Sequence, residues 1–178
     1  PIVTQLLDII CLTTGMGFTA IARVTEDKWI TCAVNDKIKF GLKPGDELKV
    51  ETTICNEVRQ DEQAVFIDNV ATSETYAKHP TPAMYGFSSY ISVPLYKKDG
   101  SFFGTICAID KKIAKIDTEE IRGMFQLYAE LISFHLEAIE EKENAVAELN
   151  EEHQIAELRE QFIAILGHDL KIPSPLRE

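Results

Sequence analysis

No proline interrupts the chain between about Asp117 and Gly167, and this stretch constrains the fold more than any other part of the sequence. Proline inside a helix removes a hydrogen bond and kinks or ends it, so its absence, together with helical spacing of apolar residues, predicts one helix of roughly fifty residues. At a rise of 1.5 Å per residue this helix would be about 75 Å long, more than one domain can bury. We therefore expect it to pair with a second copy in a parallel homodimer.

Apolar residues within this helix fall into successive stripes. The first stripe predicts packing on a sheet and consists of Leu127, Leu131, Phe134 and Ala138. The next two predict seams against another helix and consist of Ile139, Val146 and Leu149, then Ile155, Leu158, Phe162 and Ile165. These two seams are out of phase, which implies local unwinding or overwinding near residues 149 to 155 and makes that region a candidate bistable element.

The chain carries a formal net charge of -11, and the charge is unevenly placed. Between Glu137 and Glu160, nine glutamates stand against Lys142 and Arg159. Such a run is typical of the solvated face of a helix. Nucleic-acid binding needs basic patches that contact phosphates, so this acidity argues against nucleic acid as a partner.

The part of the chain before the long helix is predicted to form one α+β domain. A hydrophobic content of 45% over 178 residues is enough for one core. Helical spacing predicts a helix at residues 2–14, and β-rich runs predict strands at 18–25, 29–34, 64–67, 89–96 and 102–109. A turn at residues 26–28 predicts that the first two strands form an antiparallel hairpin. Thr52 is expected to cap a short helix that ends at Arg59. Residues 68–87 hold two prolines and several aromatics, which predicts a segment that covers something.

The strand predicted at residues 89–96 carries two kinds of side chain in alternation. Ile91, Val93 and Leu95 should face helices, whereas Tyr90 and Ser92 should face a cavity. An Asp-Gly pair follows this strand and predicts a hairpin to the next one.

Near the end of the long helix, His168 stands beside Asp169 and away from the apolar stripe. An exposed imidazole with an ordinary pKa near 6.5 is a nucleophile at neutral pH. A neighbouring carboxylate orients the ring and stabilises its developing positive charge, and Lys171 suits an anionic substrate. These parts fit phosphoryl transfer. The alternatives are a surface histidine near a chain end and a solvated charge at Asp169.

The segment Phe162-Ile163, with His168-Asp169-Leu170-Lys171 and Pro173 after it, resembles the H box of sensor histidine kinases. The resemblance implies that His168 is the phosphoacceptor, that Asp169 is an orienting acid or base, and that a response regulator receiver domain is a partner. It departs from the pattern at Ser174-Pro175. Nothing after His168 resembles the ATP-binding boxes of a kinase, so we expect no enzyme activity from this chain alone and ATP to act only through a catalytic domain of the parent histidine kinase.

Several segments before the long helix resemble GAF domains that precede histidine kinase cores. They are Cys55–Arg59, His79–Pro82, Tyr85–Phe87, Ser92–Leu95 and Gly104–Asp110. The resemblance implies a six-stranded antiparallel sheet with helices on both faces and a small-molecule pocket on one of them, followed by the long helix in a dimeric coiled coil. We expect a GAF sensory domain at residues 2–137, a coiled-coil signalling helix at 138–160 and the truncated start of a phosphoacceptor domain at 161–178.

The pocket that this resemblance implies has eight candidate ligand-binding residues. They are Trp29, Cys55, Asn56, Tyr76, His79, Tyr85, Tyr90 and Ser92. Relatives bind cyclic nucleotides, bilins, haem or small metabolites, so the fold does not name the ligand. A covalent bilin is not expected, because the covering segment holds His79 but no cysteine.

Each candidate also has a structural interpretation. His79 can contact a ligand or, as we favour, hydrogen-bond its own loop. The tyrosines can aim hydroxyls inward or simply pack, and Trp29 can stack on a planar ligand, although a strand tryptophan is usually core. Cys55, beside Asn56 near a helix start, can be a redox thiol of lowered pKa, but a small buried hydrophobe is the favoured interpretation.

The four cysteines show no pattern of a disulfide framework or a zinc site. Cys11, Cys32, Cys55 and Cys107 are far apart, without a Cys-x-x-Cys pair or a suitably spaced histidine. We expect reduced thiols in a cytoplasmic setting and no metal. Cys32 and Cys107 alternate with apolar strand residues and should be core.

The sequence contains no run of about eighteen apolar residues that would span a membrane. The apolar segment 2–13 includes Asp8 and lacks a basic leader, so it does not read as a signal peptide. Membrane anchoring elsewhere in the parent protein stays open.

Three functions follow from these observations. The first is a sensory and dimerisation module that relays a signal along the helix to His168. The second is a GAF domain with thiol redox enzyme activity, which would need two cysteines within reach of each other in the pocket. The third is a dimerisation module without a ligand.

Overall fold

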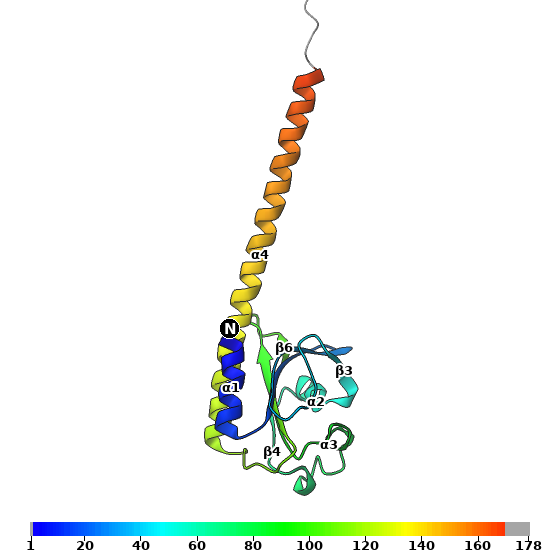
Figure 1. Ribbon diagram of the computed structural model, residues 1–178, viewed down its shortest axis with the longest axis vertical. Coiled ribbons are helices and arrows are strands. Elements are labelled where there is room, and N and C mark those ends of the chain that lie inside the picture. Colours follow the sequence, from blue (N-terminus) through cyan, green and yellow to red (C-terminus); the bar gives the residue numbers. More distant parts are fainter. Residues whose placement is uncertain (1, 170–178) are drawn as a thin grey trace, which may run out of the picture. The chain divides into compact units, whose positions relative to one another are not determined.

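The computed structural model of the chain describes residues 2–169, and for residues 140 and 166–169 it describes the backbone only. Pro1–Leu136 and Glu137–Glu178 form two separate compact units. The elements follow one another as α1 (Ile2–Thr14), β1 (Phe18–Val24), β2 (Lys28–Asp36), β3 (Glu47–Lys49), the short 3-10 turn η1 (Val50–Thr52), α2 (Ile54–Asp61), β4 (Val65–Ile67), a second such turn η2 (Val70–Thr72), α3 (Pro80–Tyr85), β5 (Ser89–Tyr96), β6 (Phe102–Asp110) and α4 (Glu119–Asp169) (Figure 1).

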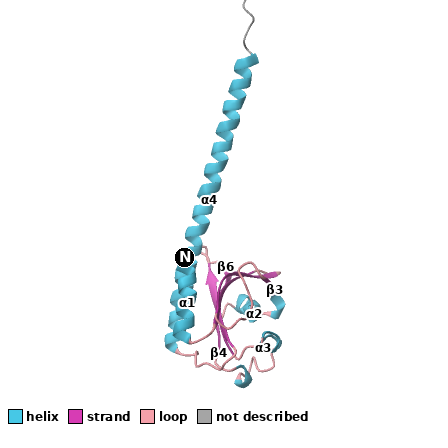
Figure 2. Cartoon of the chain, in the orientation of Figure 1, coloured by secondary structure: helices cyan, strands magenta, loops and turns pink. Residues whose placement is uncertain are grey.

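The strands within the described residues form one antiparallel sheet of six, in the order β3-β2-β1-β6-β5-β4 (Figure 2). Each of the predicted hairpins, β1 with β2 and β5 with β6, is present. At the second turn Gly100 has a φ of 80°, a left-handed conformation that glycine adopts without strain, and Asp99 accepts the backbone N–H of Ser101.

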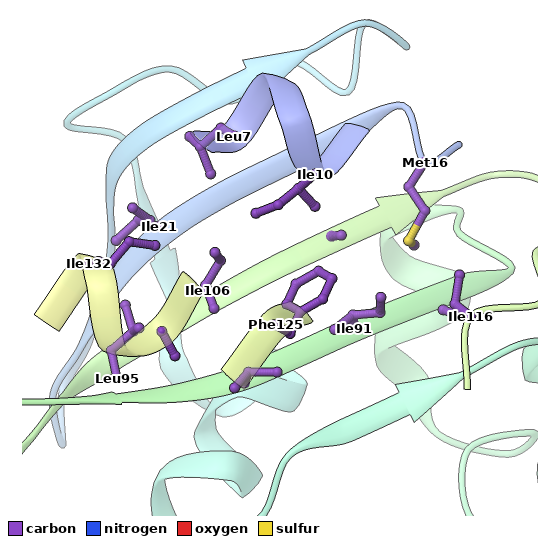
Figure 3. Close-up of a cluster of buried hydrophobic side chains, with 13 residues drawn as sticks. Leu7, Ile10, Met16, Ile21, Ile91, Leu95, Ile106, Ile116, Phe125 and Ile132 are labelled. Carbon is purple, nitrogen blue, oxygen red and sulfur yellow. The ribbon is translucent and has the colours of Figure 1, made fainter. Parts of the chain in front are cut away.

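Helix α1 and the first part of α4 cover one face of the sheet. Leu7 and Ile10 from α1 lie in one apolar cluster with Phe125 and Ile132 from α4, and all four are fully buried (Figure 3). The strands contribute Ile91, Val93, Leu95 and Ile106 to the same cluster, so the prediction that the first three face helices is confirmed. Complete burial of an apolar side chain of this size contributes about 1.5–3 kcal/mol.

The opposite face packs against α2, α3 and the segment between β2 and β3. Phe18, Trp29, Tyr90 and Cys107 from the strands form a buried cluster with Ile54 from α2. Tyr90 and Ser92 are buried on this side, as their alternation with Ile91 and Val93 predicts. The fold is therefore α+β, with helices on both faces of the sheet and a long C-terminal helix.

The prediction for the first stripe of α4 is wrong. Leu127, Leu131 and Phe134 are exposed rather than packed on the sheet. The buried residues of this part of the helix are Phe125, Ala129 and Ile132. Residues 119–136 are apolar on more than one side, so spacing alone does not say which stripe meets the sheet.

Four further local predictions need correction. The helix α2 begins at Ile54 with Thr53 at its N-cap, while Thr52 lies in η1. The segment 68–87 contains the short helix α3, and the sheet includes the strand β3, neither of which the sequence pattern indicates. Cys32 is exposed rather than core.

A β-bulge explains the position of Cys32. In the pairing of β1 with β2, Ile21 opposes Ala33 and Ala22 opposes Thr31, so Cys32 is the extra residue of β2. A bulge of this kind shifts the alternation of side chains by one residue. Trp29 and Thr31 point inward and Cys32, which alternates with them, is exposed. Beyond the bulge, Val34 rather than Ala33 packs on the cluster of Trp29.

The apolar residues of the two predicted seams in residues 137–165 are all exposed in this single chain. His168 and Asp169 are helical, because α4 ends at Asp169, but their side chains lie outside the described part of the chain. The later H-box residues Leu170, Lys171 and Pro173 also lie outside the described residues. None of the described helices is long and apolar enough to cross a membrane.

Candidate functional site

A small enclosed cavity lies between the sheet and α2 and α3. Its volume is about 30 Å³, and its wall is almost entirely apolar. The lining residues are Phe18, Trp29, Phe40, Leu42, Leu48, Thr53, Ile54, Cys55, Thr81, Tyr85, Phe87, Tyr90, Cys107 and Ile109. A water needs roughly 10–15 Å³ measured in this way, whereas sites for drug-sized ligands occupy about 300–1,000 Å³. In this form the cavity accommodates one or two water-sized molecules and excludes haem, bilins and nucleotides.

The strand hairpin supplies the polar part of the cavity wall. Ser92 on β5 lies directly opposite Cys107 on β6, and Tyr90 lies opposite Ile109. Because side chains alternate along a strand, Thr105 and Cys107 share the face of Tyr90 and Ser92. The register of this hairpin thus gathers three hydroxyl groups, those of Tyr90, Ser92 and Thr105, on the face that carries Cys107.

Helix α2 brings a second thiol to the same group. Ile54, Cys55 and Val58 form its buried side, so the Cys55 side chain points at the sheet. Thr105 Oγ1 donates a hydrogen bond to Cys55 Sγ at 3.2 Å, and the Tyr90 hydroxyl lies 3.1 Å from the same sulfur. The Ser92 hydroxyl lies 3.6 Å away. Cys55 and Cys107 are both reduced and buried.

These contacts change the acidity of both thiols. The neighbouring Cys107 side chain, followed by the hydroxyls of Thr105, Tyr90 and Ser92, lowers the pKa of Cys55 from 9.0 to about 6, although burial acts in the opposite direction. Interaction with Cys55, and then burial, raises the pKa of Cys107 well above its usual value. Burial, and next the charge on Cys55, raises the pKa of Tyr90. Near neutral pH the favoured arrangement is therefore a Cys55 thiolate beside a Cys107 thiol.

The indole of Trp29 is a further polar group in the cavity wall. Trp29 is 3% exposed, and its Nε1–H has no hydrogen-bond partner among the described residues. A buried donor without a partner costs roughly 1–3 kcal/mol. An acceptor oxygen held in the cavity would remove that cost.

Helix α3 closes the cavity through contacts with η1 and α2. The hydroxyls of Tyr85 and Thr52 lie 2.7 Å apart, and Thr81 Oγ1 donates to Thr52 O at 2.7 Å. His79 caps α3, because its Nδ1 accepts the N–H of Thr81, and its Nε2 lies 2.7 Å from Glu57 Oε1. Both ring nitrogens of His79 are thus engaged, which leaves neither for a haem iron or another metal.

The eight candidate pocket residues do not all come together. Trp29, Cys55, Tyr85 and Tyr90 line the cavity, and Ser92 contacts the Cys55 sulfur.

The other three candidates lie outside the cavity lining. Asn56 accepts hydrogen bonds from Arg59, and His79 is the cap described above. Tyr76 is half-buried; burial, and next the Glu57 carboxylate, raises its pKa to about 12. The described residues contain no group of three or more His, Cys, Asp or Glu side chains that could hold a metal.

Sequence reasoning missed Thr105; it favoured Cys107 as core, and it could not show that Cys55 and Cys107 lie within reach of each other, as thiol redox activity would need. The hairpin register sets Cys107 opposite Ser92, but only because a bulge near the turn, between the Tyr96–Phe102 and Leu95–Gly104 pairs, shifts the count by one residue; counting back from the turn alone would set Ile106 there. That Cys55 reaches the same point is a tertiary contact between residues fifty positions apart in the chain.

Comparison with protein families matches the GAF domain over residues 1–136. The chain belongs to the GAF domain family. The predicted resemblance to a GAF domain is confirmed.

Three known proteins are similar to this chain. The diguanylate cyclase DgcP of Escherichia coli (strain K12) is 26% identical over 153 residues, which cover 84% of this chain and 42% of that protein. The GAF domain of a two-component sensor histidine kinase from Bacillus halodurans has a TM-score of 0.60 at 16% identity, covering 78% of this chain and 93% of that one. A type II free methionine-R-sulfoxide reductase from Thermoplasma acidophilum has a TM-score of 0.56 at 16% identity, covering 74% of this chain and 86% of that one. The two structural similarities reflect the shared fold.

Proposed function

We propose that the chain is the sensory and dimerisation module of a two-component sensor histidine kinase and relays the state of its GAF domain to the phosphoacceptor His168. The observation that carries this proposal is the continuity of α4. One helix of 51 residues, Glu119–Asp169, begins with side chains buried in the core of the GAF domain and ends with the two H-box residues His168 and Asp169.

The chemistry at the end of α4 is phosphoryl transfer. His168 supplies the nucleophilic imidazole nitrogen, and Asp169 orients the ring and stabilises its positive charge during attack. The phosphoryl donor is ATP, held by a catalytic domain of the parent protein. The partner that takes the phosphoryl group from His168 is the receiver domain of a response regulator. This chain is then a substrate of the kinase and has no kinase activity of its own.

Dimerisation explains the exposed apolar side chains of α1 and α4. Leu127, Leu131 and Phe134 recur at helical spacing on α4, and Ile2, Ile9 and Leu12 do so on α1; each of them is at least 41% exposed. Further along α4, Val146 and Leu149, then Leu158 and Phe162, continue the pattern. A second copy covers such a seam by symmetry, because the same stripes meet each other.

A signal reaches His168 only if the GAF domain has two states that differ in how they hold the helix pair. A ligand shifts the balance by its difference in affinity for those states. The out-of-phase seams near residues 149 to 155 provide a place where the helix pair can adopt two packings. In the ligand-free alternative the cavity serves only as core, and the domain contributes dimerisation alone.

The decisive experiment measures phosphorylation of His168 in the intact parent protein. With ATP labelled at its γ-phosphate we expect acid-labile label, and the variant His168→Gln should lose it. The matched control is His153→Gln, which removes an exposed histidine from the same helix and should keep the label. Label that persists in His168→Gln contradicts the proposal. An output domain of a different class, such as the cyclase in the Escherichia coli relative, would leave both variants unlabelled.

A further inference from the structure

Two of the four cysteines, distant in sequence, meet in the wall of the small cavity. Cys55 from α2 and Cys107 from β6 both line it. Thr105 Oγ1 lies 3.2 Å from the first sulfur and 3.9 Å from the second. We infer that this cavity is an oxidation site for hydrogen peroxide, in which Cys55 is the nucleophile and Cys107 closes a disulfide. One part of this inference, that the disulfide is the signal relayed along α4, rests on the proposed sensory function.

The surroundings of Cys55 single it out as the reacting thiol. A thiolate, not a thiol, attacks a peroxide, and charge on a buried sulfur needs donors around it. Thr105 donates to Cys55 Sγ, and the hydroxyls of Tyr90 and Ser92 lie within hydrogen-bond distance. Cys107 instead contacts a backbone acceptor, Ala20 O, at 3.6 Å. The hydroxyl cluster thus stabilises negative charge on Cys55.

The size of the cavity selects the oxidant. A volume of about 30 Å³ admits hydrogen peroxide but no substrate as large as methionine sulfoxide. The site therefore favours peroxide sensing over a reductase reaction on a larger substrate.

The reaction balances with these groups alone. The Cys55 thiolate attacks one peroxide oxygen, the O–O bond breaks, and Cys55 becomes a sulfenic acid while hydroxide leaves. The proton of the Cys107 thiol converts that hydroxide to water. The Cys107 thiolate then attacks the Cys55 sulfur, the S–O bond breaks, and the second hydroxide takes up the proton lost when Cys55 ionised. Two thiols lose two electrons in total, and one peroxide is reduced to two waters.

A route from the disulfide to α4 is present in the sheet. Cys107 lies on β6 between Ile106 and Ala108, whose side chains face the other way and belong to the cluster that holds Phe125 and Ile132 of α4. A disulfide that pulls α2 and β6 together therefore acts on the strand against which α4 packs.

The first experiment uses the Cys32→Ser variant of the whole chain, because Cys32 is exposed and would react by itself. Reduced protein is mixed with equimolar hydrogen peroxide at neutral pH. We expect the loss of two hydrogen atoms in the intact mass and a linked peptide pair containing Cys55 and Cys107. Adding Cys107→Ser should leave a sulfenic acid on Cys55, seen as one added oxygen in the intact mass and trapped by dimedone once the protein is denatured. Adding Cys11→Ser, which removes another buried thiol, should change neither result.

Variants that keep both thiols guard against a folding defect. Thr105→Val removes the hydroxyl donor to Cys55 and should slow disulfide formation about tenfold, since a hydrogen bond to a charged group is lost. Bulky cumene hydroperoxide should react at least about tenfold more slowly than hydrogen peroxide, because the cavity excludes it. Absence of the linked pair, or equal rates for the two peroxides, overturns the inference.

The signalling part is tested separately in the intact parent protein. His168 phosphorylation that differs between the reduced and oxidised forms supports the relay, and an unchanged level in a fully oxidised sample overturns it. Phosphorylation missing from both forms contradicts the proposed function but leaves the oxidation site standing, because the linked peptides are measured without ATP.

Discussion

His79 Nε2 lies 2.7 Å from Glu57 Oε1 and thereby joins α3 to α2 over the cavity. Because Nδ1 of the same ring accepts the N–H of Thr81, the proton of a neutral imidazole resides on Nε2 and points at the carboxylate. This pair holds α3 against α2, and Tyr85 of α3 forms part of the cavity wall.

Removing this pair should loosen the contact of α3 with α2 without unfolding the domain. Glu57→Gln is expected to lower the global free energy of unfolding by at most about 1 kcal/mol, since the pair is partly exposed. Amide hydrogen exchange in residues 76–86 should become faster, because that segment opens locally. Glu74→Gln, an exposed change just before that segment, should leave exchange as it is. Equal exchange in both variants would show that the pair does not hold α3 against α2.

The acidity of Cys55 predicts how stability depends on pH. Its pKa is about 6 in the folded protein and 9.0 by default, so the thiolate contributes stability that is complete above pH 9 and is lost as pH falls through 6. Between these values the free energy of unfolding should rise with pH by up to about 1.4 kcal/mol per unit. The raised pKa values of Cys107 and Tyr90 make the free energy of unfolding fall with rising pH. They do so only above the ordinary pKa of each group, where that group ionises in the unfolded chain.

Chemical denaturation at several pH values between 6 and 9, with thiolate ultraviolet absorbance, measures this slope. Cys55→Ser should remove both the slope and the thiolate absorbance that appears near pH 6. Cys11→Ser should retain both. A slope that survives in Cys55→Ser would mean that another group titrates in this window.

Two neighbouring residues of α4 should respond very differently to truncation. Ile132 is fully buried and Leu131 is 46% exposed. Ile132→Ala should therefore lower the free energy of unfolding of the isolated subunit by about 2–5 kcal/mol, through lost burial and the cavity left behind. Leu131→Ala should cost less than about 1 kcal/mol. Denaturant unfolding at protein concentrations below dimerisation tests the pair, and the reverse order would reassign the face of α4 that meets the sheet.

Leu131 and Ile132 also show which parts of the fold could be predicted from the sequence and which could not. Element types and both hairpins followed from periodicity and turn chemistry, and the strand 89–96 showed its two faces by alternation. Helix α4 is apolar on more than one side, so spacing could not rank Ile132 above Leu131 as the core residue. Cys32 was misplaced for a related reason, because one bulge residue shifts the alternation and leaves no mark in composition.

The candidate site was predictable only in part. Tyr90 and Ser92 could be placed on the cavity side from alternation alone, and Trp29 and Cys55 were candidates by residue type. The meeting of Cys55 with Cys107 depends on how α2 docks on the sheet, which no local pattern encodes. Asn56 and His79 are polar groups satisfied by their neighbours, Arg59 for the first and Glu57 with Thr81 for the second, and sequence could not distinguish such groups from groups free to bind a ligand.

The exposed stripe on α4 predicts the behaviour of a charged variant. Phe134 is 72% exposed although it is large and apolar, and in a symmetric dimer the stripe of one copy meets the stripe of the other. Phe134→Glu places two like charges against each other and removes apolar contact, so the dimer dissociation constant should rise at least about tenfold. Sedimentation equilibrium measures this directly. Gln126→Glu adds the same charge to an exposed site beside the stripe and should change the constant little. If both variants weaken the dimer equally, net charge rather than the stripe controls association, and if neither does, the two copies meet elsewhere.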